Sequence, residues 1–117
     1  MDIVQKIESA LEGFIPWFTE VPEFADEQAP SKYVIVNIVE KGGNYSESVG
    51  RCTEYFVNLN VFTKRLDFAL YERLKNAMYG ADFSYIGGGS VGDDKTYPYA
   101  AHYYLDFMGV IEYEQVE

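Results

Sequence analysis

The alternation in residues 51–63, RCTEYFVNLNVFT, constrains the fold most. Successive side chains of a strand point to opposite faces, so this run predicts a long strand with one apolar face. The side chains of that face are Tyr55, Val57, Leu59 and Val61. The β-branched run at residues 33–40 predicts a second strand that is covered on much of both faces. Lys41-Gly42-Gly43-Asn44 predicts a turn, so the two strands would form a long antiparallel hairpin with a polar tip at residues 41–50.

Two amphipathic runs predict helices. The first follows Asp2, which forms a capping-box pattern with Gln5, and it ends at Gly13 and Pro16. The second covers residues 64–79, with Thr63 as its cap and Gly80 at its end. Its expected core stripe comprises Leu66, Ala69, Leu70, Leu74, Ala77 and Met78. Phe68 and Tyr71 lie off this stripe, so they either widen the buried face or contact a partner.

The remaining segments complete the predicted order. Residues 15–31 are acidic and contain three prolines, which favours a short edge strand near residues 18–21. A short strand at residues 83–86 leads to a flexible acidic loop at residues 87–94, and residues 99–108 predict the last long strand. The order is helix, hairpin, helix, hairpin. It predicts one α+β domain over residues 1–117, an antiparallel sheet with two helices packed on one face.

The charge balance narrows the function classes. Nine basic and 19 acidic residues give a net charge of −10, which would repel a polyphosphate, so sequence-specific DNA binding is not expected. One cysteine and one histidine exclude an internal disulfide framework and disfavour a His/Cys metal site. No apolar run approaches the roughly 20 residues of a membrane span. The acidic N-terminal residues Asp2, Glu8 and Glu12 also argue against a signal peptide, so a cytosolic chain is expected.

One short motif could carry chemistry. Gly88-Gly89-Ser90-Val91-Gly92 matches G-x-S-x-G, the nucleophile elbow, in which the serine sits on a strained strand-to-helix turn. No helical pattern follows here, and the glycines favour a mobile loop. His102 lies mid-strand, where a hydrogen-bonded sheet histidine is the simpler interpretation. We therefore expect no catalytic residue, no metal and no cofactor, with an enzyme around Ser90 and His102 as an alternative.

The arrangement resembles the small tail terminator proteins of long-tailed bacteriophages and prophages, also called tail completion or head–tail joining proteins. The resemblance covers nearly the whole chain and rests on element order. Its elements are an N-terminal amphipathic helix, the strand YVIVNIVE, the passage from RCTEYFVNLNVFTK into RLDFALYERLKNAM, and the closing strand YPYAAHYYLDF. It depends most on the strand-to-helix junction at residues 58–66.

The resemblance implies a structural role without catalysis. Members of this family form a hexameric ring that caps the tail tube, ends its polymerisation and joins the tail to the head. The implied partners are other copies of the chain, the major tail tube protein and the head–tail connector proteins, with genome DNA passing through the ring unbound. The implied location is the virion tail, assembled in the host cytoplasm. An acidic lumen would let DNA slide.

Two sets of residues are candidates for these contacts. The candidate interface with a neighbouring copy or with the tube comprises Asn44, Tyr45, Glu47, Arg51, Phe68, Tyr71, Tyr103 and Tyr104. The candidate flexible loop, facing the lumen or a docking partner, comprises Gly88, Gly89, Asp93 and Asp94. Two non-enzymatic alternatives stay open. One is a neighbouring head–tail connector or minor tail protein, and the other is a small monomeric module that binds ligands on an aromatic sheet.

Overall fold

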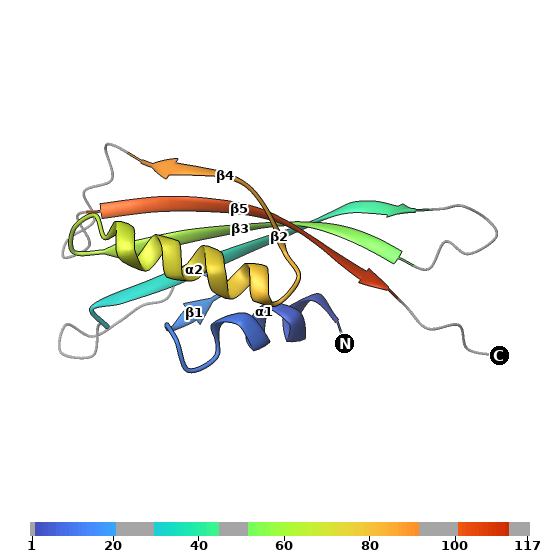
Figure 1. Ribbon diagram of the computed structural model, residues 1–117, viewed down its shortest axis with the longest axis horizontal. Helices are drawn as coiled ribbons and strands as arrows, with labels where there is room; N and C mark the ends of the chain where they lie inside the picture. The colour runs from blue at the N-terminus through green and yellow to red at the C-terminus, as the bar shows by residue number, and fades with distance from the viewer. Residues whose placement is uncertain (1, 21–29, 45–51, 92–100, 113–117) are drawn as a thin grey trace.

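Figure 1 shows the computed structural model of the chain, which describes residues 2–20, 30–44, 52–91 and 101–112. Within these residues, one five-stranded sheet is combined with two helices, which confirms the predicted α+β class. The elements in chain order are α1 (Ile3–Leu11), β1 (Trp17–Phe18), β2 (Lys32–Asn44), β3 (Cys52–Thr63), α2 (Phe68–Gly80), β4 (Ser84–Ser90) and β5 (Ala101–Glu112).

The strands lie in the order β1-β2-β3-β5-β4. β3 is central and pairs antiparallel with β2 on one side and with β5 on the other. The prediction of a purely antiparallel sheet is wrong, because β1 pairs parallel with the start of β2, at Trp17↔Val34 and Phe18↔Ile35. A tight hairpin cannot join two parallel strands, so β1 adds a parallel strand to an otherwise antiparallel sheet. The predicted edge strand exists, but it begins at Trp17.

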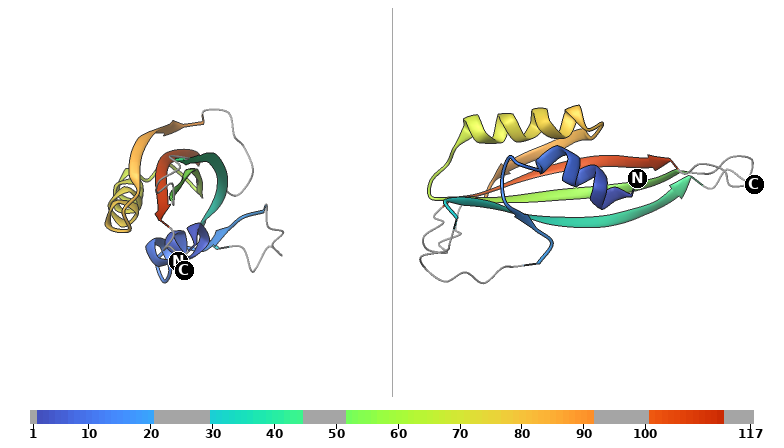
Figure 2. Two further views of the ribbon diagram at one scale, coloured as in Figure 1. Left: turned by 90° about the vertical axis from the view of Figure 1, so that its right-hand side faces the viewer. Right: turned by 90° about the horizontal axis from the view of Figure 1, so that it is seen from below.

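One face of the sheet forms the core with both helices. The main buried cluster joins the helices to the strands, with α1 contributing Ile3, Ile7 and Leu11 and α2 contributing Leu70, Leu74 and Met78. The predicted apolar face of β3 lies in this cluster: Val57, Leu59 and Val61 are fully buried. A second, smaller cluster is formed by buried Tyr33 and Ile35 of β2 with Phe18 and Phe62 packed against them. The two helices also contact each other. Figure 2 shows the sheet curving, with β4 at one border and β1 at the other.

The first helix follows the predicted capping pattern. The Gln5 backbone N–H donates to Asp2 Oδ1 at 2.8 Å, and the Asp2 backbone N–H donates to Gln5 Oε1 at 2.8 Å. This reciprocal capping box satisfies two amides that a helix start leaves unpaired. Gly13 follows the helix with φ of +71°, a left-handed conformation that favours glycine.

The second helix begins four residues later than predicted. Its N-cap is Asp67, whose side chain accepts a hydrogen bond from the Leu70 backbone N–H at 3.1 Å. Thr63, the predicted cap, instead donates its hydroxyl to the Arg65 carbonyl oxygen at 2.5 Å. Residues 64–67 therefore form a connection between β3 and α2, held at both ends by side-chain hydrogen bonds.

The later start changes which residues are buried. Leu66 precedes the helix and is 47% exposed, and Ala69 is exposed as well, so their predicted place in the core is wrong. Tyr71, predicted to lie off the stripe, is only 2% exposed. It stands three residues before Leu74 and seven before Met78, so helical geometry places all three on one face.

The predicted turn at Lys41–Asn44 is also wrong, because β2 continues through these residues. Gly43 pairs with Thr53, and Asn44 pairs with Cys52. A register shift between Glu40 and Gly43 breaks the ladder, as a β-bulge does. The two glycines therefore mark an irregularity within the strand rather than its end.

The predicted loop at residues 87–94 begins as a strand. Gly87, Gly88 and Gly89 belong to β4 and pair with β5 at Asp106, Leu105 and Tyr104. A Cβ on Gly88 would lie 2.5 Å from the Tyr104 carbonyl oxygen, closer than real Cβ atoms come. Glycine at this position allows the backbones of β4 and β5 to approach closely. The predicted flexible loop is therefore a paired strand at Gly88. Asp93 and Asp94 lie outside the described residues.

The core assignment predicts the effect of a buried charge. We expect Leu74→Asp to unfold the domain, because Leu74 is fully buried in the shared core and an unpaired buried carboxylate costs several kcal/mol. Thermal melting followed by circular dichroism measures this. The matched control, Ala69→Asp on the exposed face of the same helix, should melt close to wild type. Similar melting of the two variants would contradict the assignment.

Candidate functional site

An aromatic cluster links α2 to β5 beside the N-terminal end of the helix. The rings of Tyr71 and Tyr103 stack with centroids 4.1 Å apart. Phe68 meets both rings edge-on, with centroid distances of 5.7 Å and 6.1 Å. Tyr71 is buried, and the described residues offer its hydroxyl no hydrogen-bond partner. Of the predicted interface residues here, Tyr71 is therefore an inner support, Tyr103 is half-buried and Phe68, at 61% exposed, forms the outer surface.

The edge strand β4 lies next to this cluster and has an exposed apolar border. Its only partner among the described residues is β5, and those residues leave its outer backbone edge without a paired strand. Tyr85 and Ile86 are 45% and 53% exposed, and Val91 directly after the strand is 40% exposed. We define the β4 flank as the outer edge of β4 with Leu66, Phe68, Tyr85, Ile86 and Val91.

A charged group of α2 supports the flank. Lys75 forms an ion pair with Glu72, with Nζ and Oε1 2.7 Å apart, and its ammonium lies 4.8 Å from the centre of the Tyr85 ring. The hydrogen bond to Glu72 is the main cause that raises the pKa of Lys75 above its usual value. The lysine therefore carries its charge beside an exposed aromatic ring, which is favourable for a cation–π contact.

The face of the sheet away from the helices carries aromatic and polar rows. Tyr33 and His102 stack on either side of Phe62, with centroid distances of 5.0 Å and 4.4 Å. Asn58 accepts from Asn37 at 3.0 Å and donates to Asp106 at 2.6 Å across three strands. These rows tie β2, β3 and β5 together on the side opposite the core.

His102 is part of this network. Its Nε2 lies 2.8 Å from Asn60 Oδ1, which fits the predicted hydrogen-bonded sheet histidine. Ser90 and His102 both line one pocket of about 250 Å³. However, Ser90 ends an antiparallel edge strand, whereas the nucleophile elbow needs a turn from a parallel strand into a helix. The geometry of the described residues does not build that motif.

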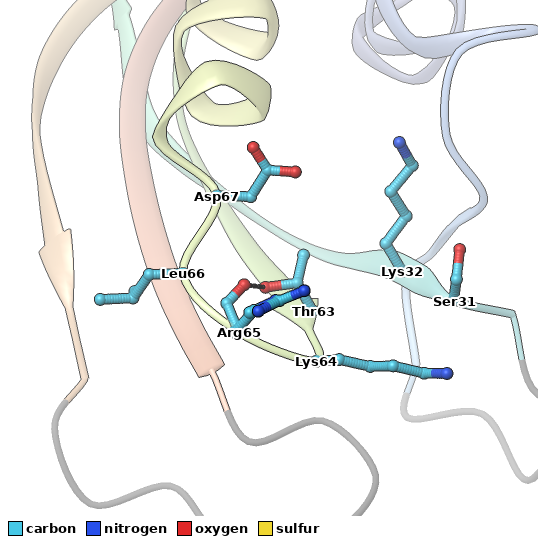
Figure 3. A pocket seen from close by; sticks show the side chains of 7 residues that line it. All are labelled: Ser31, Lys32, Thr63, Lys64, Arg65, Leu66 and Asp67. Carbon is cyan, nitrogen blue, oxygen red and sulfur yellow. Dashed lines mark hydrogen bonds between the residues drawn. The ribbon is translucent and has the colours of Figure 1, made fainter.

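A second pocket, of about 310 Å³, lies where β3 leads into α2 (Figure 3). It is lined by Ser31 and Lys32 on one side and by residues 63–67 on the other. Lys32, Lys64 and Arg65 surround it, with one carboxylate, Asp67. We call this site the cationic pocket. The sequence did not predict this site, because Lys32 and Thr63 become neighbours only through the register of β2 and β3.

The other predicted site residues divide into two groups. Tyr104 is half-buried in β5, where its ring lies against Gly89: a Cβ at Gly89 would be 3.4 Å from the ring. Asn44 ends β2 in register with Cys52. Tyr45, Glu47, Arg51, Asp93 and Asp94 lie outside the described residues, so their predicted contacts stay predictions.

Two classes of site find no support in the described part of the chain. Neither helix there is long and apolar enough to cross a membrane. No group of three or more His, Cys, Asp or Glu side chains among those residues is placed to hold a metal ion.

A scan against models of protein families and a search of the curated proteins both find no match to this sequence.

The close approach of Gly88 to the Tyr104 carbonyl oxygen allows a test of the pairing between β4 and β5. We expect Gly88→Ala to destabilise the protein by about 2 kcal/mol, because the added methyl collides with a backbone oxygen of β5 that cannot move independently. Gly87→Ala is the matched control, since a Cβ there meets nothing within 4 Å. Chemical denaturation of both variants measures the difference. Equal stability of the two variants would show that β4 does not pair as described.

Proposed function

We propose that this chain is a structural protein of the phage tail terminator kind. In this role it forms a ring, of six copies as the family resemblance implies, that caps the tail tube and joins the tail to the head. The β4 flank carries the proposal: an open strand edge lies next to exposed Leu66, Phe68, Tyr85 and Ile86. Exposed apolar side chains that border an unpaired strand edge are typical of a protein–protein contact.

The two borders of the sheet differ, which suits a ring. β4 runs along one border, and at the other border β1 covers only two residues of the 13-residue strand β2. A closed ring needs a heterologous interface, in which one surface of each copy fits a different surface of its neighbour. A sheet with two unlike borders offers such a pair of surfaces to its neighbours.

The charge also supports the proposed role. Six copies with a net charge of −10 carry −60 in total, which is 6 × −10. Acidic surface around a lumen repels the phosphate backbone, so DNA would pass without being held. This is the opposite of the counterion-release attraction that basic DNA-binding proteins use.

A second candidate function rests on the aromatic and polar side chains on the face of the sheet away from the helices. The stacked row of Tyr33, Phe62 and His102 beside hydrogen-bonded asparagines would suit a small monomeric module that binds a ligand on this face. The two candidates differ in oligomeric state. A binding module would stay a monomer and lose its ligand when Phe62 is changed, whereas a ring protein would assemble.

The proposal predicts where the gene lies and what its product does. We expect the gene to lie beside a major tail protein gene, and electron microscopy of the two co-expressed products to show rings and tubes capped at one end. Tubes of uncontrolled length with no bound ring, and a chain that stays monomeric in their presence, would contradict the proposal.

A variant of the flank tests which surface assembles. Phe68→Asp should leave the monomer folded, because Phe68 is 61% exposed, and it should stop ring formation, because it places a charge in the proposed contact. Asn76→Asp, an exposed change on the same helix, is the control and should assemble normally. Light scattering of the purified variants measures assembly. If Phe68→Asp forms rings at the wild-type yield, the β4 flank is not part of the ring interface.

A further inference from the structure

The cationic pocket is unusual in so acidic a chain. Three of the nine basic residues, Lys32, Lys64 and Arg65, surround one open space. None of the three forms an ion pair with another residue in the described ranges. The one carboxylate of the pocket, Asp67, already accepts a hydrogen bond from the Leu70 backbone N–H as the N-cap of α2. The pocket therefore offers positive charge that the described structure leaves available.

The fold holds the pocket in place. Thr63 is only 5% exposed, and its hydroxyl fixes the Arg65 carbonyl oxygen, so the backbone that carries Lys64 and Arg65 is anchored. Strand register sets Lys32 opposite Thr63 on the neighbouring strand. Figure 3 shows Lys32 and Asp67 on opposite sides of the space, with Thr63 and Arg65 between them. The cations thus come from two rigid elements rather than from one free loop.

The chemistry of the pocket selects an acidic peptide segment. Lysine and arginine side chains attract carboxylates, and arginine binds them with two parallel hydrogen bonds. Leu66 lines the same pocket and is 47% exposed, so an apolar side chain of the ligand would find a contact next to the charges. A segment that mixes carboxylates with apolar residues fits this combination best.

The chain carries such a segment at the other end of its sheet. Glu54 and Glu112 are exposed near the far ends of β3 and β5. Residues 105–117 contain four acidic residues, Asp106, Glu112, Glu114 and Glu117, and no lysine or arginine. In Figure 1, β5 begins beside the start of α2 and ends at the opposite side of the molecule. We call residues 112–117 the acidic end.

A subunit cannot bring its own acidic end to its own pocket. Eleven strand steps separate Ala101, which pairs with Thr63, from Glu112, which pairs with Cys52. At about 3.4 Å per step this distance is about 37 Å. The five residues beyond Glu112 reach at most about 18 Å when fully extended. Contact between the pocket and the acidic end therefore requires two copies of the chain.

We propose that the cationic pocket of one copy binds the acidic end of a neighbouring copy, and that this head-to-tail contact closes the ring. The inference rests on the proposed function. It supplies what a ring of anionic subunits needs, a local attraction between unlike surfaces that offsets the repulsion between like-charged copies. The contact is heterologous, as ring closure requires.

A charge swap tests the pairing. The pocket variant carries Lys64→Glu and Arg65→Glu, and the end variant carries Glu112→Lys, Glu114→Lys and Glu117→Lys. Each variant alone should fail to assemble, because like charges meet at the contact. An equimolar mixture should form rings with equal numbers of the two variants, since each pocket then faces an oppositely charged end. Native mass spectrometry resolves the composition.

The control is Lys41→Glu with Arg73→Glu, which changes the net charge by the same amount at two exposed positions away from the pocket, and it should assemble. If the pocket variant forms rings as readily as the wild-type protein, the inference is wrong and the proposed function still stands. A mixture that stays monomeric, although both variants melt like wild type, would overturn the acidic end as the partner.

A peptide assay tests binding of the acidic end to the cationic pocket independently of ring assembly. A fluorescent peptide with the sequence of residues 110–117 should bind the wild-type protein, and Lys64→Gln with Arg65→Gln should weaken binding by about fivefold or more. Raising the salt from about 50 mM to about 500 mM should weaken it as well. No peptide binding, or pocket-dependent binding of a DNA duplex instead, would contradict the inference. A monomeric wild-type protein that still binds the peptide would count against the ring alone.

Discussion

The structure depends on the pairing of β3 with β5. The two strands stay in continuous register from Cys52↔Glu112 to Thr63↔Ala101, and β2 pairs along the other side of β3. Alternation then sends Val57, Leu59 and Val61 to one face, where both helices cover them. A sheet this long cannot be covered everywhere by two short helices. Among the described residues, no strand pairs with the outer edge of β4.

Local signals in the sequence were sufficient for the elements that depend on local physics. The capping box at Asp2, the alternation of β3 and the α+β class follow from neighbouring residues. The errors concern pairings between distant residues. Gly88 looks flexible until β5 lies against it, and the parallel strand β1 depends on a return of the chain to the start of β2. The start of α2 was misplaced because both Thr63 and Asp67 are good caps. Thr63 pairs with Lys32 and Ala101 as the last residue of β3, so the helix starts after Asp67 instead.

The sequence predicted the candidate site only in part. Phe68 was expected at a surface contact and is exposed, whereas Tyr71 was expected there and supports Phe68 from within. The cationic pocket was not predicted because no sequence motif links Lys32 to Lys64 and Arg65, which meet only through strand register. In the proposed ring, the three cations of the cationic pocket lie at one end of the sheet of each subunit, and Glu112 lies at the other end. Such polarity orients neighbours, and the apolar β4 flank would add the burial that charges alone do not supply.

The central claim is that the chain acts by binding copies of itself through unlike surfaces. Native mass spectrometry of the purified protein, alone and with tail tubes, tests this most directly. The account predicts a closed assembly with a mass near six times 13.4 kDa. A single species of 13.4 kDa at every concentration, with and without tubes, would contradict it.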